Sequence, residues 1–432
     1  MRGLAGLGVA LAIALGGATP VAEALDYSTA PFRVSTHPYA FGQAPVFMPD
    51  GKRVLFGKDF RQGQKNQVYI ANFNGSNLEC LTCTGPGSST DNVNGVPAVR
   101  PQGDWVLFHS WRGHYMTIGS PGYGGMGSAL WVMHPDGSDQ TQLTDVFPAS
   151  ATPGAGEGID DYHAYWSPDG KHLVWAHLNW NFITGGGQGK WDVRVADFVV
   201  KDGKPMLTNV RVVRPDNGHW YETQWWSPDG KGFLYTETYG SAVNPELFYC
   251  RLTAHGCEVT RLTNNSAWDE QAIFTPDGKD VIFMSSRARP GFFNSWSELA
   301  QTAGLTTDED YLLILPIFEA GFLQPIAQES TDLYEIDLAT SSVRRLTTDG
   351  DDGWITPEFT WDPTNRFLMW TENRVPDGLR YQLPVDLNNY LKQAQALLSN
   401  PPKPGVDLSP NGVGVAPIPI EQRTRIGRFA PR

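Results

Sequence analysis

The sequence predicts an all-β fold: a six-bladed β-propeller of four-stranded antiparallel blades, closed by an N-terminal strand and carrying a C-terminal helix. Three observations lead to it. One phrase recurs six times, an apolar strand followed by a turn of the Pro-Asp-Gly kind and a second apolar strand. Large side chains keep one register around these turns, and most units end in Leu-Thr. Repeats of this period are typical of one supersecondary unit arrayed around an axis.

The chemistry of the turns explains why a hairpin forms at each copy. Proline fixes φ, aspartate caps the turn, and glycine accepts the left-handed backbone conformation. Each turn therefore joins the first and second strands of one blade. The six turn prolines are Pro49, Pro101, Pro168, Pro228, Pro276 and Pro363.

Large side chains, most of them aromatic, stand at two fixed distances from these prolines. We expect them to form the core between neighbouring blades, because sheets that pack face to face around an axis bury large rings. Two residues before the proline are Phe47, Val99, Trp166, Trp226, Phe274 and Trp361; seven residues after it are Phe56, Phe108, Trp175, Tyr235, Phe283 and Trp370.

Two more strands complete most units, with a turn between them and Leu-Thr at the end of the second. Examples are Leu81-Thr82, Leu143-Thr144, Leu262-Thr263 and Leu346-Thr347. The last unit has an expected third strand around Arg380–Val385 and no obvious fourth. We expect Pro31–Thr36 to supply the fourth strand, since closing the ring removes exposed sheet edges.

These motifs carry a family resemblance. The S-P-D-G-K turns, the D-G-S turns and the terminal L-T resemble the WD40-like (PD40) repeats of TolB-like six-bladed propellers, from about Pro31 to Leu387. The resemblance implies the fold and leaves the activity open, because widespread folds host many functions. Related propellers include periplasmic binding scaffolds, gating domains of prolyl-oligopeptidase-type peptidases, and secreted carbohydrate-cleaving enzymes such as oligogalacturonate lyase.

The N-terminal segment and the cysteines both indicate a secreted or periplasmic protein. Residues 1–24 have Arg2, an apolar run and an Ala22-Glu23-Ala24 cleavage site, which is typical of a signal peptide. The expected pairing is two local disulfides, Cys80 with Cys83 and Cys250 with Cys257. A C-x-x-C pair also occurs in redox and zinc sites, but no second such pair or adjacent histidine supports either.

The propeller is expected over residues 25–386, with two departures from the repeat. Residues 287–329 form an insertion in blade five, either a lid over one face or a packing or partner-binding excursion. Residues 387–432 are expected to form the C-terminal helix and an extended or disordered tail. The helix is predicted over Asp386–Asn400, where apolar residues recur at helical spacing.

The charge of the chain excludes some partners. A formal net charge of −13 argues against nucleic acid and anionic membrane surfaces, which need basic patches. Beyond the signal segment, no stretch is long and apolar enough to span a bilayer. We expect a monomer.

Candidate site residues follow from the repeat, because strand one begins and strand two ends on the same face of the ring. That face surrounds the channel mouth, which is a natural ligand pocket. Histidine and carboxylates gather there in blades three to six, whereas blades one and two contribute mostly small residues. The predicted ligand-binding residues are His163, His177, Asp161, Glu222 and Gln271.

Three functions are candidates for this polar face of the ring. A binding scaffold for a glycan, a glycoside or a protein partner needs only this asymmetric polar face. A carbohydrate-active enzyme, either a glycoside hydrolase or a lyase acting on uronate-containing glycosides, needs paired carboxylates; the candidates are Glu358, Glu237, Glu270 and Glu372. A serine peptidase is disfavoured because the sequence has no G-x-S-x-G nucleophile motif.

A divalent metal ion is a candidate cofactor through the resemblance to oligogalacturonate lyase. That enzyme binds its metal with a histidine-rich set that includes a glutamine. His163 and Gln271, with His177 and Glu358, are the positions here that resemble such a set, since imidazole and carboxylate suit a divalent ion. The histidines are fewer, however, and the full ligand pattern does not align.

Overall fold

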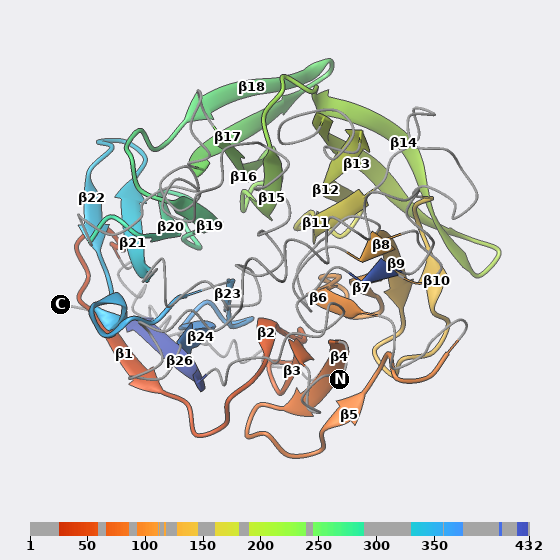
Figure 1. The fold of residues 1–432 in the computed structure, drawn as a ribbon, viewed down its shortest axis with the longest axis horizontal. Coiled ribbons are helices and arrows are strands. Elements are labelled where there is room, and N and C mark those ends of the chain that lie inside the picture. Colours follow the sequence, from red (N-terminus) through yellow and green to blue (C-terminus); the bar gives the residue numbers. More distant parts are fainter. Residues whose placement is uncertain are drawn as a thin grey trace, which may run out of the picture.

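The structure is a computed structural model that describes residues 26–58, 66–85, 93–110, 112, 116–117, 128–145, 160–180, 190–238, 245–288, 330–356, 358–374, 406–407 and 421–430. These residues form six four-stranded antiparallel sheets set around a common axis (Figure 1). The predicted six-bladed propeller is confirmed. Helical structure among the described residues is limited to one 3-10 turn, η1 (Asp349–Asp352).

Each blade runs outward from the axis, with its first strand innermost (Figure 1). A short parallel pair, β8 (Met116–Thr117) with β25 (Val406–Asp407), stands outside the blades. Blade one consists of β2 (Gln43–Phe47), β3 (Arg53–Lys58), β4 (Gln67–Asn72) and β5 (Glu79–Cys80), and blade two of β6 (Asn94–Val99), β7 (Val106–Ser110), β9 (Ala129–Met133) and β10 (Thr141–Gln142). Blade three consists of β11 (Asp160–Trp166), β12 (His172–Trp180), β13 (Lys190–Lys201) and β14 (Lys204–Arg214), and blade four of β15 (Tyr221–Trp226), β16 (Gly232–Thr238), β17 (Pro245–Thr253) and β18 (Gly256–Arg261). Blade five consists of β19 (Asp269–Phe274), β20 (Asp280–Ser285), β21 (Asp332–Asp337) and β22 (Val343–Arg345), and blade six of β23 (Phe359–Trp361), β24 (Leu368–Arg374), β26 (Glu421–Phe429) and β1 (Phe32–Thr36).

The turns behave as their chemistry predicts. Gly170 has φ +67° and donates its backbone N–H to the carbonyl of Ser167 at 2.8 Å. The Asp169 carboxylate accepts hydrogen bonds from Ser167 Oγ and from the backbone N–H of Lys171. A side chain at the glycine position would be strained by that left-handed backbone.

The repeated rings form the core between blades. Trp175, Trp370, Tyr235, Phe56 and Phe108 are at most 1% exposed. The tryptophans two residues before the turn proline also donate hydrogen bonds to the neighbouring blade, a role that the sequence pattern did not reveal. The indole N–H groups of Trp166, Trp226 and Trp361 bond to the backbone carbonyls of Ala98, Tyr165 and Phe274 at 3.2, 3.1 and 2.9 Å.

Blade six closes the ring with strands from both ends of the described chain. The N-terminal strand β1 is the outermost strand, as predicted, and it pairs with β26 from Phe32 opposite Phe429 to Thr36 opposite Arg425. The predicted third strand at Arg380–Val385 is wrong, because β26 holds that place beside β24. Part of the segment expected to be an extended or disordered tail is therefore a strand. Arg380–Val385 and the predicted helix at Asp386–Asn400 lie outside the described residues.

Ion pairs fix β26 in this blade. Arg423 lies 2.7 Å from Glu372 through Nε and 2.7 Å from Asp349 through Nη2. Its guanidinium also stacks over the ring of Trp354, 3.8 Å from the centroid. The Glu372 carboxyl is fully buried, and burial, together with the charge of Asp349, raises its pKa to about 7.

Replacing this arginine tests the contribution of the ion pairs. We expect Arg423→Ala to lower the free energy of unfolding by about 3 kcal/mol, because it leaves the buried Glu372 without its nearest cation. Arg251→Ala is the control, since its pair with Glu258 at 3.5 Å is exposed on both sides and contributes about 0.5 kcal/mol or less. Urea unfolding measures both; equal losses would show that the buried pair has no special role.

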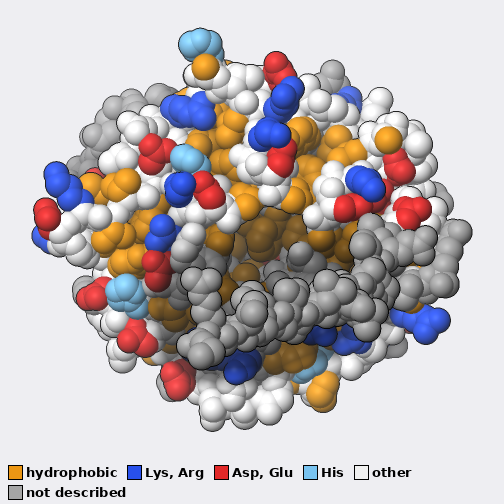
Figure 2. Space-filling model, turned by 180° about the vertical axis from the view of Figure 1, so that it is seen from behind, with side chains coloured by type: hydrophobic (Ala, Val, Ile, Leu, Met, Phe, Trp, Pro, Cys, Tyr) orange, Lys and Arg blue, Asp and Glu red, His pale blue; other side chains and the backbone are white. Residues whose placement is uncertain are grey.

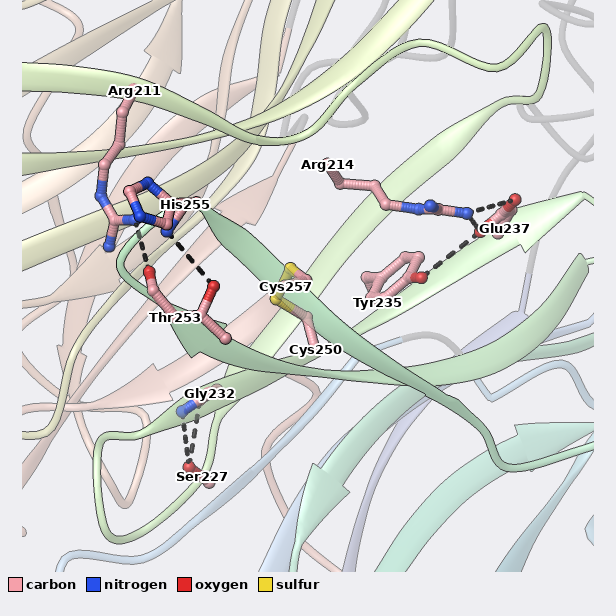
Figure 3. Close-up of a disulfide and its surroundings, with 10 residues drawn as sticks. All are labelled: Arg211, Arg214, Ser227, Gly232, Tyr235, Glu237, Cys250, Thr253, His255 and Cys257. Carbon is pink, nitrogen blue, oxygen red and sulfur yellow. Dashed lines mark hydrogen bonds and ion pairs between the residues drawn. A yellow bond between two sulfur atoms is a disulfide. The ribbon is translucent and has the colours of Figure 1, made fainter.

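Both predicted disulfides are present. Cys80 is bonded to Cys83, and Cys250 to Cys257, and no free cysteine is found among the described residues. The second bond joins β17 to β18 near their hairpin turn (Figure 3). Two local disulfides stabilise folded chains in oxidising compartments.

The remaining predicted segments fall mostly outside the described residues. This holds for the signal segment 1–24 and for residues 289–329 of the insertion. The insertion does lie between β20 and β21, the second and third strands of blade five, as predicted. In the described part of the chain, no helix has the length and apolarity needed to cross a membrane.

Candidate functional site

A shared irregularity in the innermost strands brings polar side chains to the axis. The pairing of strands one and two shifts register in blades one to five, within the segment from six to two residues before the turn proline. Four residues at the fifth position have left-handed backbones, with φ between +46° and +48°: Ala44, Val96, His163 and Gln271. This is the geometry of a β-bulge, which re-aims side chains. As a result, side chains five and six places before the turn proline come together from different blades.

Five of the predicted residues form what we call the axial cluster: His163, Glu222, Glu270, Gln271 and Glu358. They come from blades three, four, five and six, and each is more than 90% buried. Glu222 is at its centre. Its Oε1 accepts hydrogen bonds from Gln271 Nε2 at 2.8 Å and Gln224 Nε2 at 3.0 Å, and lies 2.8 Å from His163 Nδ1.

Two neighbouring carboxyls of the cluster, Glu222 and Glu270, lie in different surroundings. Burial, and then the charge of Glu222, raises the pKa of Glu270 well above its usual value. The Glu270 carboxyl bonds to Glu222 and accepts a hydrogen bond from Trp268 Nε1 at 2.6 Å. Glu222 accepts hydrogen bonds from two amide groups, whereas burial and the neighbouring carboxylate favour the protonated form of Glu270.

Glu358 differs from the other two carboxyls. Neither of its side-chain oxygens has a hydrogen-bond partner among the described residues. Burial raises its pKa, while His163 and the backbone amides of Glu358 and Ala44 favour its charged form. The two amides lie near the carboxyl without making hydrogen bonds of good geometry. A buried carboxyl so weakly bonded is costly, and it is the feature of the cluster that points to a missing partner.

Burial disfavours the charged forms of the two histidines near the axis. Burial lowers the pKa of His163, against the opposing charges of Glu358 and Glu270. Burial and then His163 lower the pKa of His109 further. The two rings are 6.2 Å apart, and the backbone N–H of Ala164 donates to His109 Nε2 at 3.4 Å.

Aromatic side chains border the cluster, and the sequence analysis did not identify them as part of the site. Tyr165 has its pKa raised well above its usual value by burial and then by Glu358, Glu222 and Glu270. Its ring lies 5.2 Å from that of Trp225. The half-buried Trp225 packs against apolar clusters of blades one and two and also of blades five and six, so it reaches across the ring. The repeat pattern could have identified these two residues, because both stand three places before a turn proline.

One face of the ring is hollowed near its centre. Figure 2 shows hydrophobic side chains gathered in and around this hollow, with most charged side chains farther out. A concave surface at the axis is the usual place for a ligand on a fold of this kind.

The structure gives the other predicted residues separate partners. Glu237 accepts hydrogen bonds from Arg214, Asn217 and Tyr235 and lies 2.7 Å from His219 (Figure 3 shows Arg214 and Tyr235). Glu372 belongs to the ion pairs of blade six. The expected approach of these two carboxylates to Glu270 and Glu358 is therefore not found in their contacts.

Asp161 and His177 form a third group within blade three. The Asp161 carboxylate lies 2.6 Å from His177 Nδ1 and accepts a hydrogen bond from Trp175 Nε1 at 2.7 Å. His177 lowers the pKa of Asp161 against the effect of its burial. All three side chains hold strands β11 and β12 together.

The axial cluster does not suit a divalent metal ion. No group of three or more His, Cys, Asp or Glu side chains that could hold one occurs in the described part of the chain. Gln271 Nε2 donates to Glu222 Oε1, and His163 Nδ1 lies 2.8 Å from the same oxygen without a hydrogen bond of good geometry. The two predicted metal ligands thus lie against a carboxylate of the protein.

The chain matches no protein-family model, and no curated protein matches it. Solved structures with a similar fold include TolB from Acinetobacter baumannii, at 15% identity and a TM-score of 0.44, over 76% of this chain and 62% of that one. An oligogalacturonate lyase in complex with manganese has 12% identity and a TM-score of 0.41, over 92% and 91% of the two chains. A puromycin-hydrolysing peptidase of Mycobacterium tuberculosis has 13% identity and a TM-score of 0.45, over 78% and 42%.

These similarities describe the fold alone. The predicted TolB-like architecture is confirmed by the six four-stranded blades themselves. The chain matches about six-tenths of the length of the Acinetobacter TolB. Function has to be argued from the axial cluster, because a propeller is compatible with many activities.

Proposed function

We propose that this chain is a secreted or periplasmic TolB-like propeller that binds a glycan or glycoside at the axial cluster. The observation that carries the proposal is Glu358, a buried carboxyl with two oxygens that lack hydrogen-bond partners among the described residues. A ligand hydroxyl would donate to it. The disulfides support the compartment, since such bonds persist outside the cytosol.

The surroundings of Glu358 favour a hydroxyl-rich ligand. The cluster offers acceptors in the Glu358 oxygens, and the raised pKa of Glu270 favours the protonated form, which is a donor. Tyr165 and Trp225 add aromatic surface, on which the apolar face of a sugar ring packs well. Every cluster member is more than 90% buried, which suits a small ligand better than a protein surface.

Cleavage of a glycoside is the second candidate function. It is favoured by one observation: burial and the charge of the neighbouring Glu222 raise the pKa of Glu270 well above its usual value. Two carboxyls with different protonation states are what acid and base roles require in glycoside hydrolysis. Mass spectrometry of the glycoside after incubation distinguishes the two functions, since hydrolysis adds water and binding leaves the ligand unchanged.

Glu358→Gln tests the proposed site. We expect it to weaken saccharide binding about tenfold or more, because an amide does not replace both acceptor oxygens of a carboxylate; tenfold corresponds to about 1.4 kcal/mol. Glu335→Gln is the control, as Glu335 is equally buried but lies in the outer part of blade five. Calorimetry with neutral oligosaccharides and aryl glycosides measures both. Equal affinities for the two variants would contradict the site, and no binding by the unmodified chain would contradict the function.

A further inference from the structure

Several buried carboxylates in this protein pair with an arginine. Six of them, each at most 2% exposed, pair with one at 3.3 Å or less. They are Glu237 with Arg214, Glu246 with Arg261, Asp269 with Arg287, Glu335 with Arg344, Asp332 with Arg345 and Glu372 with Arg423. This is the usual solution, because a buried charge is stable only when it is paired.

The axial cluster departs from this pattern. It gathers three carboxyls, Glu222, Glu270 and Glu358, and the ion pair found for them among the described residues is that of Glu222 with His163. Burial lowers the pKa of His163, which disfavours its charged form. Within the described part of the chain, the cluster therefore lacks the arginine that accompanies the six carboxylates above.

We infer that the axial cluster takes a ligand that carries a protonated amine, and that the glycan or glycoside bound there contains an amino sugar. The inference rests on the proposed function and narrows its ligand class. An ammonium group donates up to three hydrogen bonds, and Glu358 has two oxygens without partners among the described residues. It supplies the positive charge that arginine supplies at the six other carboxylates.

The aromatic side chains that border the cluster also favour a cationic ligand. Tyr165 and Trp225 pack together beside the carboxyls, and the faces of such rings attract cations. A uronate would instead add a carboxylate to a site that already holds three carboxyls. The uronate-containing glycosides considered from the sequence are accordingly disfavoured as ligands.

Calorimetry of the full chain at pH 7 tests the inference with four probes: a glucosamine tetramer, its N-acetylated counterpart, trigalacturonate and 1,4-diaminobutane. We expect the glucosamine tetramer to bind at least about tenfold more tightly than the N-acetylated form. Glu358→Gln should remove most of that preference, and Glu335→Gln, whose carboxyl has its own arginine, should keep it.

The outcomes separate the inference from the proposed function. Equal binding of the two tetramers, or tightest binding of trigalacturonate, overturns the amine preference and leaves saccharide binding intact. Binding of 1,4-diaminobutane alone, lost in Glu358→Gln, supports the ammonium site and overturns the glycan function. If no probe binds, the inference is overturned.

Discussion

A chain that ends at residue 420 is expected to lose cooperative folding. The deletion removes β26, which pairs with β24 over seven residues and with β1 over five. It exposes an edge of β24, leaves β1 without a partner, and removes Arg423 and Arg425 from the buried Glu372. Since a propeller blade is stable only against its neighbours, opening blade six disrupts both adjacent interfaces. Near-ultraviolet circular dichroism during urea unfolding shows whether a single transition remains.

A point substitution gives a graded form of the same test. Ile426 is 4% exposed and packs with Phe41 and Met369, so Ile426→Ala is expected to cost about 2 to 4 kcal/mol. Val259→Ala is the control, because Val259 lies on the outer strand of blade four and is 40% exposed; it should change stability by about 0.5 kcal/mol or less. A truncated chain as stable as the full one would show that β26 is dispensable for closure.

The blade pattern could be predicted because its determinants are local. The Pro-Asp-Gly turns specify hairpins through the backbone preferences of three adjacent residues. Rings such as Trp175 and Trp370 keep their register because they fill the same space in each blade. The N-terminal closing strand followed from counting strands, since one blade lacked a fourth.

Strand β26 was missed because its sequence does not resemble an interior strand. Residues 421–429 include three arginines, and two of them, Arg423 and Arg425, face carboxylates that come from blade six and the η1 turn. Their partners are distant in sequence, so the sequence alone suggests that these arginines lie in solvent. A strand whose side chains are satisfied by long-range ion pairs lacks the apolar alternation by which strands are recognised.

The candidate site was predicted in part for a similar reason. His163, Gln271 and Glu358 share one position in the repeat, and the sequence analysis chose that position for its place at the channel mouth. The bulge then brought Glu222 and Glu270, one place earlier, into the same cluster. Glu237 and Glu372 share another repeat position, and each forms an ion pair with an arginine. Those partners come from β14 and β26, and a repeat analysis does not reveal them.

The number of carboxyls with raised pKa values makes stability depend on pH near neutrality. Burial, opposed by Arg344, raises the pKa of Glu335 from 4.5 to about 7. Burial and then Asp349 raise that of Glu372 to about 7, and burial and then Asp277 raise that of Asp280 to about 6. In the unfolded chain these groups ionise at lower pH, so the native state binds more protons between those values. Stability therefore falls as the pH rises through the folded-state pKa values.

We expect the free energy of unfolding to decrease by about 2 kcal/mol between pH 6.5 and pH 8. Glu270 adds to this decrease, because its pKa is raised well above the usual value. The buried histidines His109 and His163 have the opposite effect below about pH 6.5, where they lower the free energy of unfolding as the pH falls. The reason is that their pKa values are lowered in the folded state, so the unfolded chain binds more protons at these residues. The two effects together place maximum stability near pH 6.

Urea unfolding at half-unit intervals of pH measures this profile, and Glu335→Gln identifies one of its sources. The variant removes a group that titrates near pH 7 in the folded chain, so it should be less sensitive to pH from 6.5 to 8 than the unmodified protein. Glu258→Gln, at an exposed carboxylate that pairs with the equally exposed Arg251, is the control and should leave the slope unchanged. Stability that is constant or rises over this interval would mean that the buried carboxyls are ionised in the folded state, and that the protonated Glu270 on which the donor role in the axial cluster depends is absent.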